Sequence, residues 1–83
     1  MAVKAFVLIE VAVGKTKEVV ATLTTLQKQV SEVRSVDAVT GPYDVIVVVE
    51  AADVNAIGDL VTRNIHSVDG IARTVTCLTV QLG

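Results

Sequence analysis

The chain has 83 residues, a formal net charge of −2, 52% hydrophobic residues and a mean hydropathy of +0.65. It is one domain, residues 1–83, and a domain of this size buries only about 60% of its unfolded surface, so this much apolar side chain predicts burial against copies of itself. The acidic balance, with no basic cluster, argues against direct DNA or RNA binding, and no apolar run approaches the ~20 residues of a membrane span.

The start of the sequence does not look like an export signal. Lys4 and Glu10 bracket an apolar run that is too short for a signal peptide, and no small-residue cleavage pattern follows. The single cysteine, Cys77, cannot form a disulfide within the chain and suits a reducing compartment. We therefore expect a cytoplasmic protein with no membrane association.

The first third of the chain predicts a strand and then a helix. Residues 3–11 are rich in β-branched and aromatic side chains, which favour strands. From Val19 to Val33 apolar residues recur every three or four positions, which predicts a helix from about Thr16 to about Ser31. Thr16 is the predicted N-cap.

The remaining elements are a hairpin, a second helix and a last strand. Gly41-Pro42 favours a tight turn between strands at residues 34–40 and 44–50. Asp53 is the predicted N-cap of a helix whose apolar stripe ends at Val68, and Asp69-Gly70 ends that helix. The last strand is expected over residues 71–82.

The order β-α-β-β-α-β predicts an α+β ferredoxin-like sandwich. Its four-stranded antiparallel sheet should have the first and third strands at the centre and both helices on one face. A sheet covered on one face should alternate polar and apolar residues, yet residues 5–9 and 45–49 are apolar on both faces. We therefore expect the uncovered face to pack against a second subunit, giving an obligate dimer at least.

Residues suited to catalysis or metal binding are few. Cys77 and His66 are the candidate nucleophile and base, but we expect Cys77 to be an inert buried residue and His66 a surface residue near a helix end. Glu10 and Glu50 would form a carboxylate pair if they lay at neighbouring strand ends, and solvated strand ends are the alternative. One His and one Cys do not make a metal site. We expect no catalytic residue, no metal and no cofactor.

The hairpin turn carries the most distinctive polar group. Asp44 opens an otherwise apolar strand beside the only tyrosine, Tyr43, and a carboxylate held there can receive an ammonium group. The alternative is a hydrogen bond from the backbone to this side chain, which is common for Asp near turns.

Two threonines of the last strand are further candidates. Thr74 and Thr76 lie two residues apart and so face the same side of the strand, where two hydroxyls can bind a carboxylate or an amide. The alternative is that threonine simply favours strands.

At these two segments the chain resembles the effector-binding domain of the Lrp/AsnC regulators, also called the RAM domain. The resemblance rests on Thr40-Gly41-x-Tyr43-Asp44 and on Val68-Asp69-Gly70-Ile71-x-x-Thr74-x-Thr76, and it covers essentially the whole chain. Members usually carry an N-terminal helix-turn-helix DNA-binding domain, whereas this sequence starts directly with the first strand. The resemblance therefore implies a stand-alone form.

The resemblance also implies an assembly and a ligand site. Dimers formed through the sheets would assemble into octamers or decamers, with a free amino acid bound between dimers. Gly41, Tyr43 and Asp44 would form the turn side of the site, with Asp44 receiving the ligand ammonium or orienting neighbouring main chain. Thr74 and Thr76 would contact the carboxylate or side chain. Pro42 departs from some members and removes one backbone donor.

These observations lead us to expect an amino-acid sensor that modulates transcription through full-length Lrp/AsnC partners. Two alternatives stay open: an interaction module that binds no small molecule, and a small dimeric ferredoxin-like enzyme.

Overall fold

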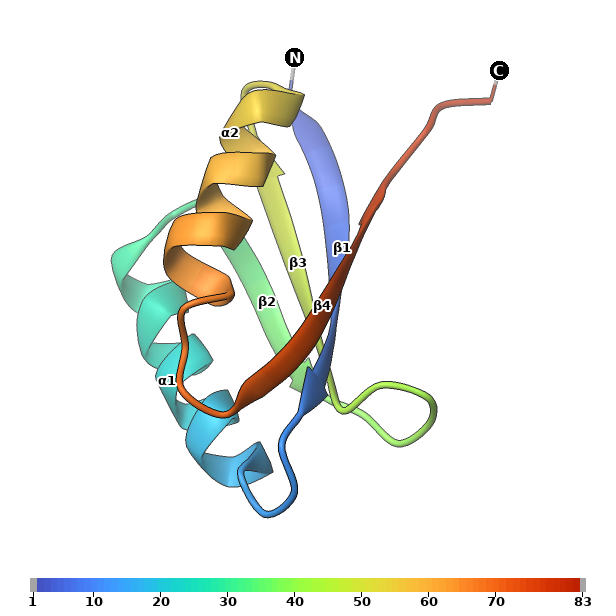
Figure 1. The fold of residues 1–83 in the computed structure, drawn as a ribbon. Helices are drawn as coiled ribbons and strands as arrows, with labels where there is room; N and C mark the ends of the chain where they lie inside the picture. Colours follow the sequence, from blue (N-terminus) through green and yellow to red (C-terminus); the bar gives the residue numbers. More distant parts are fainter. Residues whose placement is uncertain (1, 83) are drawn as a thin grey trace.

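Four antiparallel strands form one sheet in the order β2-β3-β1-β4 (Figure 1). The computed structural model describes residues 2–82. Its central strands are β1 (Val3–Val11) and β3 (Val45–Ala51), and its edge strands are β2 (Val33–Ala38) and β4 (Ile71–Leu78). The predicted ferredoxin-like α+β fold, with the first and third strands central, is confirmed.

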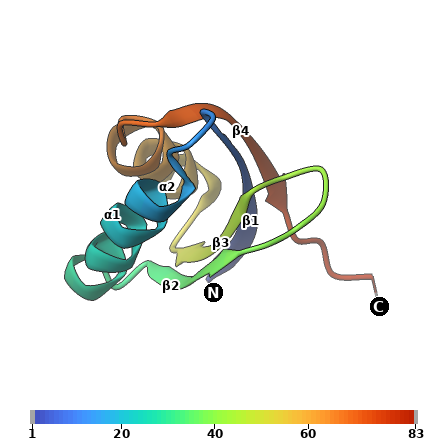
Figure 2. The same cartoon turned by 90° about the horizontal axis from the view of Figure 1, so that it is seen from below.

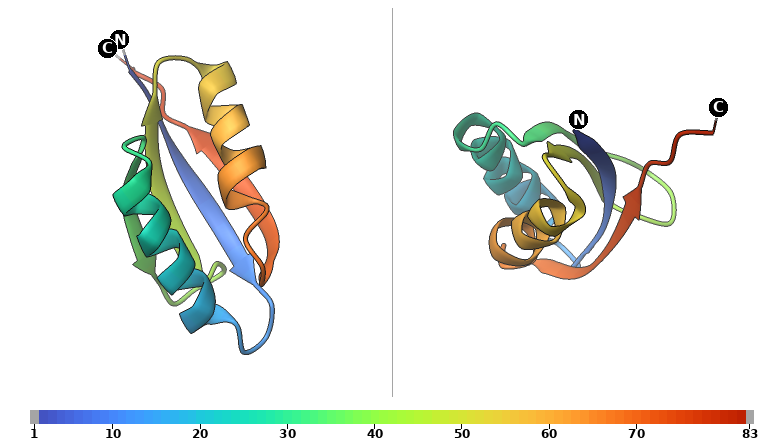
Figure 3. Two further views of the ribbon diagram at one scale, coloured as in Figure 1. Left: turned by 90° about the vertical axis from the view of Figure 1, so that its left-hand side faces the viewer. Right: turned by 90° about the horizontal axis from the view of Figure 1, so that it is seen from above.

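The helices lie together on one face of this sheet (Figures 2 and 3). They are α1 (Thr16–Gln29) and α2 (Val54–Leu60), and α2 continues as a π-helical turn, η1 (Val61–Ile65). In η1 the hydrogen bonds widen, and the His66 N–H donates to the Val61 carbonyl at 2.7 Å. Within residues 2–82, no helix or strand lies against the opposite face of the sheet, and we call it the open face.

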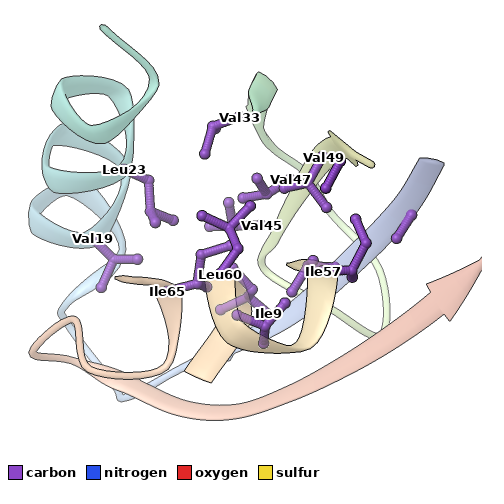
Figure 4. Packing of buried hydrophobic residues seen from close by; sticks show 14 residues of the cluster. Ile9, Val19, Leu23, Val33, Val45, Val47, Val49, Ile57, Leu60 and Ile65 are labelled. Carbon is purple, nitrogen blue, oxygen red and sulfur yellow. The ribbon is translucent and has the colours of Figure 1, made fainter. Parts of the chain in front are cut away.

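The hydrophobic core lies between the helices and the sheet (Figure 4). Alternate residues of the central strands point into it, and each is fully buried: Ala5, Val7, Ile9, Val45, Val47 and Val49. Val19 and Leu23 of α1 and Ile57 and Ile65 of the second helical segment close the core from the other side.

The start of α1 differs from the sequence prediction. Lys15 occupies the N-cap position, no side chain caps the helix, and Thr16 is its first helical residue. The Lys15 N–H donates to the Ala12 carbonyl at 3.0 Å, and Gly14 turns the chain at a φ of +81°. The N-cap is therefore Lys15, one residue earlier in the chain than the predicted Thr16.

The other predicted helix start is confirmed. The Asp53 carboxylate accepts a hydrogen bond from the Ala56 N–H at 2.8 Å. The second helical segment ends at Ile65, earlier than the predicted end at Asp69-Gly70, and a turn over residues 66–70 follows it. Gly70 closes this turn at a φ of +98° and leads directly into β4. The strand itself ends at Leu78 and not at Leu82.

Candidate functional site

The loop between β2 and β3 reaches beyond the open face, on the side away from the helices (Figures 2 and 3). The Val39 N–H donates to the Asp44 carbonyl at 2.9 Å and closes the base of this loop. Gly41 lies at a φ of +145°, which side-chain-bearing residues rarely adopt, and Pro42 is exposed beside it. The predicted tight turn is thus a wider loop over residues 39–44, because β2 ends at Ala38 and β3 begins only at Val45.

The Asp44 side chain ties this loop to the end of β1. Its Oδ2 accepts a hydrogen bond from the Val11 N–H at 2.8 Å, and its own N–H donates to the Ile9 carbonyl at 2.9 Å. Pairing of β3 with β1 ends at Val45 and Ile9, so the carboxylate takes a donor just past the last strand pair. The Asp44 carboxylate thus accepts a backbone hydrogen bond, as in the alternative given for it from the sequence, and its roles at a ligand stay predictions.

The two candidate threonines lie on the helix-covered side of β4. Thr74 is paired with Ile9 and Thr76 with Val7, and residues directly opposite in an antiparallel pair share a face. The Thr74 Oγ1 lies 3.4 Å from Nδ1 of His66, the residue that follows η1. Thr74 is half-buried and Thr76 is exposed.

The five candidate ligand residues therefore do not enclose one cavity within a single copy. β1 runs between Asp44 and Thr74, and the projecting loop and the threonines lie toward opposite faces of the sheet. A surface hollow of about 280 Å³ lies elsewhere, between the end of α1 and α2, and is lined by Val30, Glu32, Ala51, Ala56, Asp59, Leu60, Arg63 and Asn64.

The open face is apolar at its centre. Strand register places these residues on it: Phe6 and Leu8 of β1, Ile46 and Val48 of β3, and Val75 and Cys77 of β4. Phe6 is 36% exposed, and its ring lies under the Lys4 ammonium at 5.3 Å. At the other end of β1, the Arg73 guanidinium lies 3.3 Å from the Glu10 carboxylate. The face thus has an apolar centre between charged ends.

The candidates for catalysis are separated by the sheet. Cys77 is exposed on the open face in this chain, so the expectation that it is buried is wrong for a single copy. His66 is exposed, as expected, and lies on the opposite side beside Thr74. Glu10 and Glu50 are not neighbours, because antiparallel pairing places Glu50 opposite Lys4 at the far end of the sheet.

Residues 2–82 show neither a metal site nor a membrane-spanning helix. No group of three or more His, Cys, Asp or Glu residues in this range could hold a metal ion. None of the helices in the same range has the length and apolar character needed to cross a membrane.

The strand order and helix placement define a ferredoxin-like α+β domain. The chain belongs to the Lrp/AsnC ligand binding domain family, whose sequence model matches residues 4–81. It is therefore a domain of a regulatory, effector-binding type, which points away from an enzyme. No match was found among curated proteins.

Solved structures give the same fold. TTHA0845 from Thermus thermophilus is 32% identical with a TM-score of 0.83, covering 98% of this chain and 96% of that one. AsnC of E. coli is 24% identical (TM-score 0.78), covering 96% of this chain and 52% of that one. The NMB0573/L-Met complex from Neisseria meningitidis is 20% identical (TM-score 0.80), covering 95% and 50%. The chain thus spans about half of these last two proteins, whose likeness shows the fold alone.

Proposed function

We propose that residues 1–83 form one cytoplasmic amino-acid-sensing module that works as an oligomer and modulates transcription through full-length Lrp/AsnC regulators. The family match over residues 4–81 carries this proposal. The module makes no DNA contact of its own, because its net charge of −2 offers no electrostatic footprint for a phosphate backbone. It catalyses no reaction.

A free amino acid is the proposed ligand class. The regulator NMB0573, which shares this fold, was solved as a complex with L-Met. Asp44 uses Oδ2 to hold the Val11 N–H, which leaves Oδ1 to meet the ligand ammonium. Gly41 and Tyr43 would shape the loop side of the site, and Thr74 and Thr76 would offer hydroxyl donors to the carboxylate or side chain.

A neighbouring copy completes the proposed site. The loop at residues 39–44 reaches past the open face, whereas the threonines lie toward the helices, so one copy does not surround a ligand. A loop from one dimer placed near the last strand of another would bring both sets together. The arrangement requires a neighbouring dimer, and the octameric or decameric size is proposed from the family resemblance alone.

Dimers are proposed to form through the open face. Phe6, Val48 and Val75 lie near its centre, and apolar surface of this kind favours burial by about 25 cal/mol per Å². A standard interface buries about 800 Å² on each partner. Pairing two open faces would therefore cover the second apolar side of β1 and β3.

One observation favours a second candidate, an interaction module without a small-molecule ligand. The carboxylate predicted to meet a ligand is already bonded to the backbone of β1, at 2.8 Å from the Val11 nitrogen. If the Asp44 carboxylate serves only this structural purpose, the oligomer would still form but would not respond to amino acids.

Thermal unfolding in the presence of each of the twenty amino acids, including L-Met, distinguishes the two candidates. A ligand at 100 times its dissociation constant stabilises the folded state by about 2.7 kcal/mol, which raises Tm by several degrees in a domain of this size. We expect such a rise with one or a few amino acids, and its loss in the Asp44→Ala and Thr76→Val variants.

Each variant is compared with its own ligand-free Tm, because Asp44→Ala also removes the hydrogen bond to Val11. Thr62→Val is the matched control for Thr76→Val: it removes an exposed hydroxyl from η1, which contributes none of the five candidate residues. A wild-type protein whose Tm ignores all twenty amino acids contradicts the sensor and favours the interaction module. A rise that survives both site variants shows that the residues are wrongly assigned.

A further inference from the structure

Past the end of β4 the chain continues as an extended tail, residues 79–82. Thr79 holds its base, because its N–H and its Oγ1 both donate to the Lys4 carbonyl at 3.0 Å. Beyond Thr79 the tail exposes apolar side chains, with Val80 75% and Leu82 92% exposed. Val80 and Leu82 lie two positions apart and so share one side of the extended chain.

The direction of the tail is set by the sheet. It leaves the end of β4 and runs away from the helices, toward the side on which the open face looks out (Figures 2 and 3). At its base, Val80 and Gln81 line a surface hollow together with Ala2, Val3 and Lys4 of the same chain. The space ahead of Leu82 is where a second copy would stand in the proposed dimer.

The tail is long enough to cross the gap between two sheets that pack face to face. Four extended residues span about 13 Å at about 3.3 Å per residue, and two sheets packed face to face lie about 10 Å apart. The tail can therefore reach the layer of the partner sheet. No residue from Thr74 to Leu82 carries a charge, so this segment suits an apolar or backbone-pairing surface and not a charged one.

We propose that the tail of each copy crosses the dimer interface and packs Val80 and Leu82 against the partner copy. This inference rests on the proposed dimer and goes beyond it, since the sheet faces alone would leave both side chains in water. The tail then acts as a clamp that is exchanged between the two copies, with Thr79 and its two bonds to Lys4 as the fixed base.

Sedimentation of the full chain over a range of concentrations tests the clamp. The double variant Val80→Ser, Leu82→Ser should raise the dimer dissociation constant at least tenfold, which corresponds to about 1.4 kcal/mol. Gln81→Ser is the matched control, because Gln81 lies between the two apolar residues and points to the other side of the tail. It should change the constant by less than twofold.

Amide hydrogen exchange of residues 80–82 gives a second measurement that does not depend on a variant. Exchange at these residues should slow as the protein is concentrated from monomer to dimer. If these amides are protected as strongly in the dilute monomer as in the dimer, the tail packs on its own chain. If they exchange at random-coil rates in the dimer, the tail packs against neither copy. Either result overturns the inference.

The outcomes also separate the clamp from the dimer itself. A wild-type protein that stays monomeric at all concentrations removes the proposed dimer and the clamp with it. A wild-type dimer whose dissociation constant is unchanged in the double variant overturns the clamp alone.

Discussion

Asp44 shows at the scale of one residue what sequence can and cannot reveal. Its type and its place beside Gly41-Pro42 predict a carboxylate held at a turn. The donor it binds, the Val11 N–H, lies 33 residues earlier and is defined by where the pairing of β1 and β3 ends. Strand register depends on the whole sheet, so this partner was not predictable from the local pattern.

Replacing Gly70 with alanine adds only one methyl group but should clearly lower the stability of the fold. Its φ is +98°, and a Cβ added there would lie 2.9 Å from the Val19 Cγ2 and 3.0 Å from the Lys15 Cβ. We expect Gly70→Ala to lower the free energy of unfolding by about 1–3 kcal/mol, through backbone strain and overpacking. Urea unfolding at fixed protein concentration measures the change.

Gly58 provides the matched control for that prediction. It lies inside α2 and does not adopt a positive φ, and outside its chain neighbours and its own helix backbone no described atom lies within 4 Å of an added Cβ. Gly58→Ala should therefore raise the free energy of unfolding by up to about 1 kcal/mol, because alanine favours helix over glycine. Equal effects at the two glycines would contradict the packing and φ assigned to Gly70.

At the scale of elements, the two residues predicted as N-caps differ: Asp53 caps α2 with its side chain, whereas Thr16 does not cap α1. Asp53→Ala removes the hydrogen bond to the Ala56 N–H and should cost about 0.5–2 kcal/mol. Thr16→Ala removes no cap, since Thr16 is already helical, and should change stability by less than about 0.5 kcal/mol. The denaturant midpoints of the two variants, measured side by side, test this difference. A larger loss of stability in Thr16→Ala than in Asp53→Ala would show that Thr16 is a cap after all.

Element types and order followed from periodicity, whereas several boundaries did not. α1 ends at Gln29 and β4 at Leu78, both earlier than the sequence pattern predicts. The alternation continues through residues 79–82, but within one chain no neighbouring strand pairs beyond the bonds of Thr79 to Lys4. The π-helical turn η1 also gave no sequence signal, because its apolar residues fit ordinary helical spacing.

At the scale of the whole molecule, the apolar side chains of β1 and β3 are divided between two faces of the sheet, and within residues 2–82 the helices cover one of these faces. Val48→Asp places a charge at the centre of the open face and should convert the proposed oligomer into monomers at micromolar concentration. Light scattering measures the mass, and the reaction rate of Cys77 with a thiol reagent should rise as the face becomes accessible.

Val54→Asp is the control for this interface prediction. Val54 is 54% exposed at the first residue of α2, on the helix side of the molecule, where an acidic residue suits the helix start. The same substitution there should leave the mass and the Cys77 reactivity unchanged. Monomers from both variants would indicate general destabilisation, and oligomers from both would place the interface elsewhere.

The pairing of β1 with β4 also has a consequence for biosynthesis. Of the four strands of this sheet, the first in the chain lies between β3 and the last, with Ala5 opposite Leu78. During synthesis, one edge of β1 therefore has no strand to pair with until residues 71–78 have been made. The sheet closes only then, through contacts far apart in sequence, which are the slowest to form. A nascent chain halted before residue 71 should be unable to make the native sheet, however well its helices form.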